Sequence, residues 1–340
     1  MAATDFVYPS AAELQQVEQV VMPRLVMNDP LLAPDGVMPI TNDDAYLLEW
    51  EQEDNYQGLQ GVRGLDGQPS AVARIGSSRY QVQSGVYGEF STVGESEITR
   101  ARQLGSWGAP IDLAKTVRKE QDRLLQRRLD RIRWIGWNLI STGAFSVSGP
   151  SGAIHLDSYT MQTQNALVAW ATVATARPVA DFRAAKLKHR AKGVTFDSGA
   201  RAYVNSATLN ALLGNQNAAD LYGMRAPNGA TYNTLDALNG ILIANELPRI
   251  VEYDEGYIDD AGTFQLWVPN NKCIVVGKRT TGARVAEYKL TRNATNPGCA
   301  PGPYTIVKDI QGPPRSFQVH DGHNGGPCFY FPSAVIIMTV

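Results

Sequence analysis

Cysteine is scarce in this sequence, because the 340 residues contain only Cys273, Cys299 and Cys328. These form neither a C-x-x-C pair nor an even set, which argues against a disulfide framework and fits a reducing compartment. Long apolar runs are also missing, and the first residues lack a basic start followed by an apolar core. We therefore expect neither a membrane span nor a signal peptide.

Neither positive nor negative charge is in large excess. The 31 lysines and arginines face 33 aspartates and glutamates, a formal net charge of -2, so no global field would steer the protein onto nucleic acid or an anionic membrane. The phosphate-loop, nucleophile-elbow and H-E-x-x-H signatures of common enzymes are absent. What is present is 44% hydrophobic and 19% charged residues, enough apolar material for a folded chain of two or three domains.

Histidine is limited to four residues, and two of them lie in the segment VHDGHNGGPCFYFP at 319–332. His320 and His323, with Asp321 between them, would supply part of a Zn²⁺ site that needs a further protein ligand. The other histidines lie in distant and dissimilar contexts. The Asp-Gly and Asn-Gly-Gly pattern instead favours a turn in which glycine provides positive φ. We therefore predict no catalytic residue, no bound metal and no cofactor.

The N-terminal part predicts one short helix and an arm. Pro9–Val21 has Ser10 as N-cap and Glu13 at the capping-box position. Prolines at 23, 30, 34 and 39 then favour an extended arm as far as Trp50.

A glycine-rich passage follows, with glycines at 58, 61, 64 and 67, too dense for a helix and too short for collagen. Beyond it, Ser70–Ile75 and Arg79–Gln83 predict a hairpin around the turn Gly76–Ser78. Because a two-stranded ribbon is only marginally stable in water, the first hundred residues must lie on the rest of the chain or on another copy of it.

A long amphipathic helix is predicted over Ile111–Ser141. Its apolar side holds Val117, Leu124, Leu125, Ile132, Ile135 and Leu139. Its opposite side carries a basic row that consists of Lys115, Lys119, Arg123, Arg127 and Arg131. Arg128 and Arg133 lie beside this row. Such a row is a solvated face, the partner of an acidic surface on another subunit, or a surface that neutralises phosphates.

The remaining sequence predicts an α+β or α/β unit. Phe145–Tyr159 reads as two strands around a Gly-Pro-Ser-Gly turn, and Arg201–Asn215 as a strand followed by a short helix with Ser206 as cap. Helices are predicted over Thr163–Arg177 and Asp181–Lys192. Short apolar runs predict strands at 240–253, 263–269 and 271–278, and a strand pair at 326–340. The five carboxylates of EYDEGYIDDAG at 252–262 fail the EF-hand spacing and indicate a solvated acidic loop between strands.

Four segments, in this order and spacing, carry a family likeness. They are GVYGEFSTVGESEITRARQLG (85–105), QDRLLQRRLDRIRWIGWNLISTGAFSV (121–147), CIVVGKRTTGARVAEYKLTRNATNPG (273–298) and the opening VHDGHNGGPCFYFP. With these segments the chain resembles, from about residue 45 to its end, the major capsid proteins of tailed bacteriophages. Those proteins have the Hong Kong 97-type fold, and the resemblance is in particular to the lambda-like E family.

The resemblance implies an α+β fold of Hong Kong 97 type. Its parts would be an N-terminal arm (1–45), an extended β-hairpin loop (46–100), a peripheral domain (101–165) with a spine helix at 111–141, an axial domain (166–257), and a return to the peripheral domain with C-terminal strands (258–340). The loop would lie across the neighbouring subunit, with Arg74, Ile75, Arg79, Tyr80 and Val82 at the contact. The basic row is assigned to the shell interior, facing packaged DNA or scaffold. The loop cannot present a crosslinking lysine, because Lys115 is the first lysine of the chain.

The implied function is that of a major head protein, a structural component of the virion and not an enzyme. Copies would assemble in the host cytoplasm into the hexamers and pentamers of an icosahedral shell around double-stranded DNA. Partners would be the protein itself and also scaffolding, portal and decoration proteins, with no membrane. An encapsulin-like compartment is the alternative of the same fold, and a metal-dependent hydrolase built on His320 and His323 is the alternative from another class.

Overall fold

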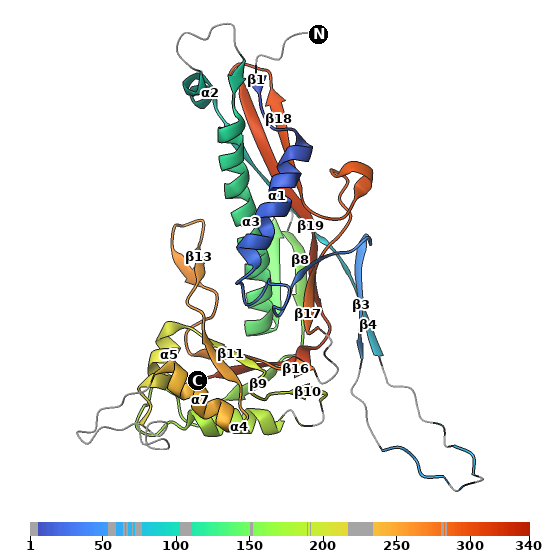
Figure 1. The fold of residues 1–340 in the computed structure, drawn as a ribbon, viewed down its shortest axis with the longest axis vertical. Coiled ribbons are helices and arrows are strands. Elements are labelled where there is room, and N and C mark those ends of the chain that lie inside the picture. The colour runs from blue at the N-terminus through green and yellow to red at the C-terminus, as the bar shows by residue number, and fades with distance from the viewer. Residues whose placement is uncertain are drawn as a thin grey trace.

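The computed structural model describes residues 6–53, 59–63, 65, 67–69, 71, 77–102, 110–149, 152–188, 190, 192–216, 234–279, 282 and 284–340. The molecule is elongated (Figure 1), with an upper body of long helices beside a sheet and a lower body that holds a second sheet and shorter helices. A two-stranded ribbon projects to one side. Helices and strands are mixed along the chain, which confirms the predicted α+β class.

The longest helix, α3 (Ala114–Thr142), is the predicted long amphipathic helix. Its 29 residues run for about 44 Å at 1.5 Å per residue. It ends at Gly143, whose φ of 83° is the left-handed conformation that glycine adopts beyond a helix C-terminus. Every apolar position predicted for its inner side is buried, namely Val117, Leu124, Leu125, Ile132, Ile135 and Leu139.

The upper sheet is built on β19 (Ser316–Phe329). The first half of β19 pairs antiparallel with both β18 (Tyr304–Ile310) and β5 (Gly85–Val93). Its last residues pair with β17 (Ala286–Leu290), which in turn pairs in parallel with β2 (Ile40–Asn42). Helix α3 packs across this sheet.

The segment HDGHNGG was predicted as a turn, and this prediction is wrong, because the segment forms the middle of β19. Its glycines are required for space. A Cβ added at Gly322 would lie 2.5 Å from the carbonyl oxygen of Tyr87, and one at Gly326 would lie 2.7 Å from a ring carbon of His155. Glycine in a strand commonly marks such close approach of neighbouring atoms, and the sequence pattern cannot separate that use from a turn.

The lower sheet has the strand order β12 (Arg249–Glu252), β11 (Arg201–Val204), β15 (Lys272–Val276), β20 (Val335–Thr339) and β9 (Gln162–Asn165). The final strand, β20, pairs with β15 and β9. The predicted strand pair at the C-terminus is therefore not formed, since β19 and β20 belong to different sheets. The C-terminal part of the chain contributes to both bodies.

Helices α4 (Pro178–Lys188), α5 (Ser206–Leu213) and α7 (Leu235–Ala244) surround the hydrophobic cluster of the lower body. The strand predicted over 240–253 is partly wrong, because its first residues form the end of α7, whose buried positions have helical spacing. The helix predicted over 163–177 is also wrong, because β9 occupies its first residues and turns follow. Asn205, rather than Ser206, caps α5 by accepting a hydrogen bond from the Thr208 N–H.

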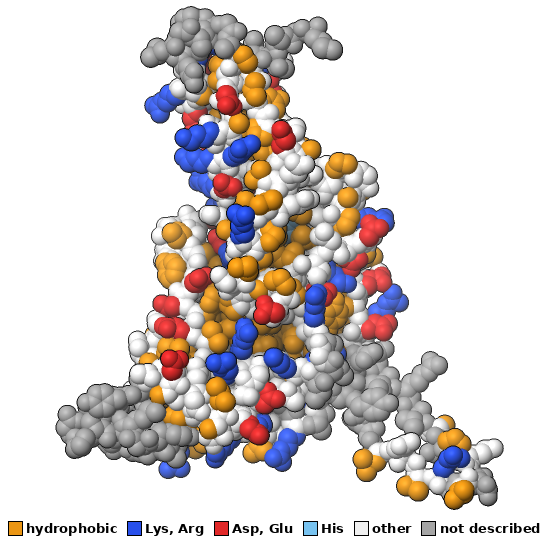
Figure 2. Space-filling view, in the orientation of Figure 1, with side chains coloured by type: hydrophobic (Ala, Val, Ile, Leu, Met, Phe, Trp, Pro, Cys, Tyr) orange, Lys and Arg blue, Asp and Glu red, His pale blue; other side chains and the backbone are white. Residues whose placement is uncertain are grey.

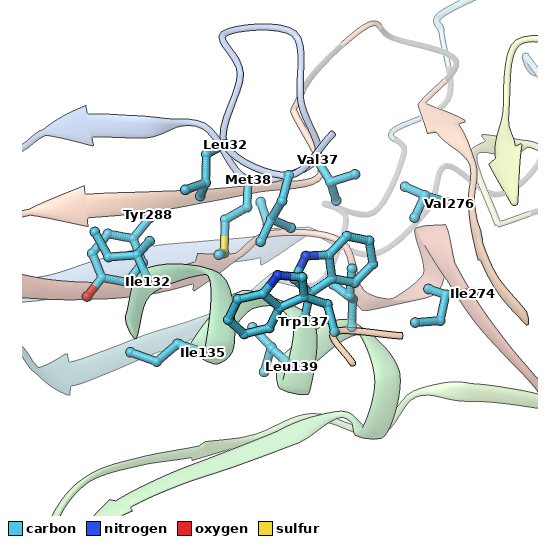
Figure 3. Packing of buried hydrophobic residues seen from close by; sticks show 14 of the residues in the cluster. Leu32, Val37, Met38, Ile132, Ile135, Trp137, Leu139, Ile274, Val276 and Tyr288 are labelled. Atoms are coloured by element: carbon cyan, nitrogen blue, oxygen red, sulfur yellow. The ribbon is translucent and has the colours of Figure 1, made fainter. Parts of the chain in front are cut away.

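Trp137, near the end of α3, connects the two bodies. Its ring stacks on Tyr253 with centroids 4.9 Å apart and meets Tyr203 edge-on at 5.5 Å. Figure 3 shows its indole among residues from several elements, including Met38 and Ile274. Both bodies therefore share one continuous core at this point.

The N-terminal arm has a hydrophobic core on its own chain. Helix α1 (Ala11–Val26) begins with the predicted capping box, in which Ser10 and Glu13 each bond the other's backbone N–H. The helix continues through Pro23, so the predicted break there is wrong. Beyond it, Leu31 and Met38 are fully buried against α3. The arm is therefore part of the subunit body, whereas the ribbon projects from it.

The ribbon consists of β3 (Leu47–Glu53) and β4 (Ser77–Gln83), which pair antiparallel. The hairpin predicted around Gly76–Ser78 is wrong, because Ser77 and Ser78 lie inside β4 and face Glu53 and Gln52 of β3. The residues that follow β4 are part of the upper sheet through β5, so the projecting part of the predicted loop ends at Gln83.

Shorter elements complete the fold. The predicted pair of strands around residue 150 is confirmed as β7 (Ala144–Gly149) and β8 (Gly152–Ser158). The other pairs are β1 (Phe6–Val7) with β6 (Ile111–Asp112), β10 (Val194–Thr195) with β16 (Lys278–Arg279), and β13 (Gly256–Ile258) with β14 (Phe264–Leu266). Helix α2 spans Glu95–Ala101, and 3₁₀ turns span Pro297–Cys299 and Pro332–Ala334.

Candidate functional site

The predicted basic row lies on the exposed side of α3. All five side chains are solvent-exposed: Lys115, Lys119, Arg123, Arg127 and Arg131. Figure 2 shows positive side chains gathered along the upper body in the region of this helix. The structure therefore places the row on one continuous surface, as its four-residue spacing predicts.

Three arginines of the row are partly engaged within the chain. Arg123 forms an ion pair with Glu120 at 3.9 Å. Arg127 donates two hydrogen bonds to the carboxylate of Glu89 on β5, at 2.6 and 3.0 Å. This contact raises the pKa of Arg127 and lowers that of Glu89. Arg131 lies over the ring of Trp134 at 5.5 Å, which is a cation–π contact.

Arg128 was grouped with the basic side, and this prediction is wrong, because its side chain is buried between α1, α3 and β19. Its guanidinium pairs with Glu18 and with Asp321, the latter at 2.7 Å. Thr305 donates a hydrogen bond to Asp321 at 3.1 Å. Burial raises the pKa of Asp321 to about 6, against the opposing effect of Arg128. This buried ionic cluster ties the arm to the sheet.

The two histidines of the candidate metal site are separated by the sheet. Residues three apart in a strand point to opposite faces, and accordingly His323 is buried whereas His320 is partly exposed. His323 shares a 3.0 Å hydrogen bond with the Tyr288 hydroxyl and stacks on Tyr87. Burial lowers the pKa of His323 to about 3, so it is neutral at physiological pH. His320 stacks on Phe90 instead. Within the described ranges, no group of three or more His, Cys, Asp or Glu residues could hold a metal ion.

The predicted inter-subunit residues divide into two groups. Arg74 and Ile75 lie outside the described residues. Tyr80 and Val82 pack with Leu48 and Trp50 of their own chain, and the Trp50 and Tyr80 rings stack at 5.5 Å. Arg79, also on β4, forms an exposed ion pair with Glu49 at 2.5 Å. The base of the ribbon is thus anchored on its own subunit.

The outer part of the ribbon is the feature that sequence analysis did not single out. Leu59, Val62 and Leu65 expose 99%, 101% and 99% of their surface. Apolar side chains are normally buried where the fold permits it, so three fully exposed ones at a regular spacing of three residues indicate a contact outside the chain. The sequence shows glycine at every third position from 58 to 67, and the residue after each of the first three glycines is one of these exposed apolar residues.

A cavity lies between the basic side of α3 and the β13–β14 hairpin. It is lined by Arg127, Arg131 and Trp134 on one side and by Tyr257 and Asp260 on the other. The hairpin contains the acidic segment predicted as a solvated loop, whose turn is held by hydrogen bonds to Asp259 from the backbone N–H groups of Ala261 and Thr263. These hydrogen bonds lower the pKa of Asp259. The acidic hairpin therefore stands beside the lower end of the basic row.

His320 and His323 lie apart, and Tyr288 and Tyr87 hold the ring of His323. These two histidines therefore do not form the metal site that their spacing in the sequence suggested. In the part of the chain that the structure describes, each helix is too short or too polar to cross a lipid bilayer. The surfaces of the described residues that are suited to contact with other macromolecules include the basic row, the cavity beside it and the apolar tip of the ribbon.

Solved structures with a similar fold belong to phage-related proteins. A protein described as the capsid protein of a prophage of Escherichia coli CFT073 aligns with a TM-score of 0.50 at 13% identity, covering 78% of this chain and 79% of that one. A phage-related protein from Bordetella bronchiseptica RB50 aligns with a TM-score of 0.53 at 10% identity, covering 89% of both chains. At these identities the likeness concerns the fold alone.

A comparison with curated proteins found no match. The model of one protein family, phage major capsid protein E, matches residues 47–297. This range begins at β3 and includes the ribbon, the long helix α3 and most of the lower body. Because the match covers well over half of the chain, the protein belongs to the phage major capsid protein E family.

Proposed function

We propose that the chain is the major head protein of a tailed bacteriophage and forms the hexamers and pentamers of an icosahedral shell around double-stranded DNA. The observation that carries this proposal is the family match over residues 47–297. Membership of this family makes the protein a structural component of the virion capsid that assembles with copies of itself, and not an enzyme.

The shape of the subunit supports assembly through the ribbon. A ribbon of two strands gains little stability in water by itself, and this one ends in three exposed apolar side chains. Of the predicted loop (46–100), we assign the projecting part, 46–83, to the contact with a neighbouring subunit, and we propose that Arg74, Ile75 and Arg79 take part in that contact. Tyr80 and Val82 would hold the base of the loop at the angle from which it reaches the neighbour.

We propose that the two bodies are the two domains expected for this fold. We assign the peripheral domain to 101–165, together with strands from 258–340, and the axial domain to 166–257. In this arrangement the tips of the lower bodies meet at the centre of each capsomer. The upper body, with α3 as the spine, would lie toward the capsomer edge, where contacts with other capsomers form.

The basic row would face the shell interior and contact DNA or a scaffolding protein. Exposed cations neutralise phosphates by releasing counterions without reading sequence, which suits a shell that accepts any genome. The five exposed positive charges of the row support this assignment, and the ion pairs of Arg123 with Glu120 and of Arg127 with Glu89 reduce the charge that is free to bind a partner. Portal and decoration proteins are further proposed partners, and assembly is proposed to occur in the host cytoplasm.

Expression of the full chain alone or with its scaffolding protein, followed by electron microscopy of the purified material, tests the proposed function. We expect closed shells with hexamers and pentamers. DNA resistant to nuclease inside shells from infected cells would support a phage head, whereas enclosed enzyme would support the encapsulin-like alternative. A subunit that stays monomeric at every concentration and with scaffold present would overturn the proposal.

Replacement of Arg123, Arg127 and Arg131 by glutamine tests the basic row. We expect folded subunits and closed shells, with a reduced DNA content or reduced scaffold incorporation. A matched variant with Arg183, Lys188 and Arg249 replaced by glutamine removes the same charge from the lower body and should leave both unchanged. Equal DNA and scaffold content in the two variants would count against an interior position of the row.

A further inference from the structure

An apolar groove lies on the upper body. It is bounded by α1, by the residues leading into β2 and by the segment from Arg284 to Pro303. Its volume of about 840 Å³ falls in the range of about 300–1,000 Å³ found for sites that bind ligands. Six prolines line it, at positions 23, 34, 39, 297, 301 and 303. Proline restricts the backbone, so the groove is largely preformed.

The groove carries no uncompensated charge. Glu18 and Arg284 are the only charged residues that line it, and all residues of the lining are described. Each is already paired within its own chain, Glu18 with Arg128 and Arg284 with Glu287. Met27, which follows the last residue of α1 and lines the groove, exposes 65% of its surface. The surface therefore fits an uncharged, apolar segment of a partner.

The tip of the ribbon has the complementary character. Its sequence GLQGVRGLDG (58–67) places an apolar residue after each of its first three glycines. In an extended polyproline-II helix, which has three residues per turn and rises about 3.1 Å per residue, Leu59, Val62 and Leu65 would lie on one edge at intervals of about 9 Å. Glycine at every third position leaves another edge of that helix free of side chains. These apolar residues are as exposed as an unfolded chain would leave them.

The ribbon is long enough to reach a neighbour. Residues 54–76 separate β3 from β4, which allows two limbs of about eleven residues, each up to about 36 Å long at about 3.3 Å per residue. The described residues of the tip lie far from the body of their own subunit (Figure 1). A second copy is therefore the partner that the tip meets in an assembly of identical chains.

We propose that Leu59, Val62 and Leu65 of one subunit dock in the proline-lined groove of a second copy of this chain, with the tip segment in an extended, three-residue-per-turn conformation. The inference rests on the proposed function, because it names the receiving surface for the inter-subunit loop. Three anchors bury far less than the roughly 800 Å² per partner of a stable isolated interface. The contact therefore acts only where other contacts of the shell already hold the subunits together.

Disulfide trapping tests the docking directly, because Cys299 is exposed and stands between two residues that line the groove, Pro297 and Ala300. Val62→Cys, and separately Leu59→Cys and Leu65→Cys, are placed in the full chain, assembled and mildly oxidised. We expect at least one variant to give covalent dimers and longer ladders on non-reducing gels of assembled shells. The same variants carrying Cys299→Ser should give none, and neither should Leu167→Cys, an exposed position outside the groove and the ribbon.

Assembly provides the second measurement. Leu59→Ser, Val62→Ser and Leu65→Ser together should raise the subunit concentration needed for shell formation by about tenfold or more, as should Met27→Asp in the groove. The matched controls, Gln60→Ser with Gln68→Ser on the tip and Val20→Asp on α1, should change it less than twofold. If the wild type forms shells but none of the three introduced thiols reacts with Cys299, or if an introduced thiol links within one chain, the docking is overturned and the proposed function stands. Absence of shells from the wild type would overturn the proposed function and the docking together.

Discussion

The buried ionic cluster leads to the sharpest prediction about the folded subunit. Arg128 is 6% exposed, and its neighbours Glu18 and Asp321 are 5% and 4% exposed. In Arg128→Met the apolar volume is roughly kept, while two carboxylates lose their only guanidinium partner in the cluster. Removing one partner of a buried pair costs about 3–5 kcal/mol, because an uncompensated charge stays buried. We expect a loss of that size in the free energy of unfolding at pH 7.5.

The loss in the free energy of unfolding caused by Arg128→Met should be smaller at low pH. The pKa of Asp321 is raised in the folded state to about 6, above its ordinary value of 3.8. The folded protein therefore binds this proton more tightly than the unfolded chain, and the contribution of Asp321 to stability rises as the pH falls from about 6 to about 4. Without Arg128 the pKa of Asp321 rises further, because Arg128 lowers it in the wild type. The variant should thus recover part of its stability at pH 4.5, where the carboxyl group is neutral.

Urea unfolding of unassembled subunits at pH 7.5 and pH 4.5, followed by tryptophan fluorescence, measures both effects. Arg127→Met is the control, because its pair with Glu89 is exposed and exposed pairs contribute at most about 1 kcal/mol. Equal losses for Arg128→Met at the two pH values would refute the reasoning, because they would show that charge burial is not the cause. A loss below about 1 kcal/mol at pH 7.5 would refute it as well.

Three further predictions concern packing and backbone conformation, each measured by urea unfolding of unassembled subunits. Trp137→Ala should cost about 3–5 kcal/mol, because the ring joins the cores of the two bodies; a cost below 1 kcal/mol would show that the bodies do not depend on it. Gly143→Ala should destabilise the subunit by about 1 kcal/mol or more, because Gly143 has a φ of 83°. Gly240→Ala should stabilise it by about 0.5–1 kcal/mol, because Gly240 has open space around it inside α7. Equal effects of the two substitutions would contradict the argument from backbone conformation. Gly326→Ala should cost about 1–3 kcal/mol by crowding His155 and Leu48, and Gly312→Ala, with no neighbour within 4 Å, should be near neutral.

Local signals in the sequence were sufficient for α3, for the capping box of α1 and for the β7–β8 pair. In each case the deciding interactions are close in sequence: apolar positions with a helical period, a side chain bonding a backbone N–H three residues away, and a turn between adjacent strands. The family likeness added the order of parts, which single elements could not supply. These features determined the fold class and the class of function.

Tertiary contacts decided the rest. Pairing between β3 and β4 joins residues about thirty positions apart, and nothing local distinguishes this partner from the adjacent segment that was predicted. The glycines of HDGHNGG serve close packing in β19, because Tyr87 and His155 arrive from distant strands. Arg128 lies four residues from both Leu124 and Ile132, on the buried face of α3, and Glu18 and Asp321 from distant segments neutralise it there. The sequence by itself determined the long helix α3, the capped start of α1 and the family that the chain resembles. Burial, strand partners and the separation of the two histidines instead arise from contacts between segments far apart along the chain.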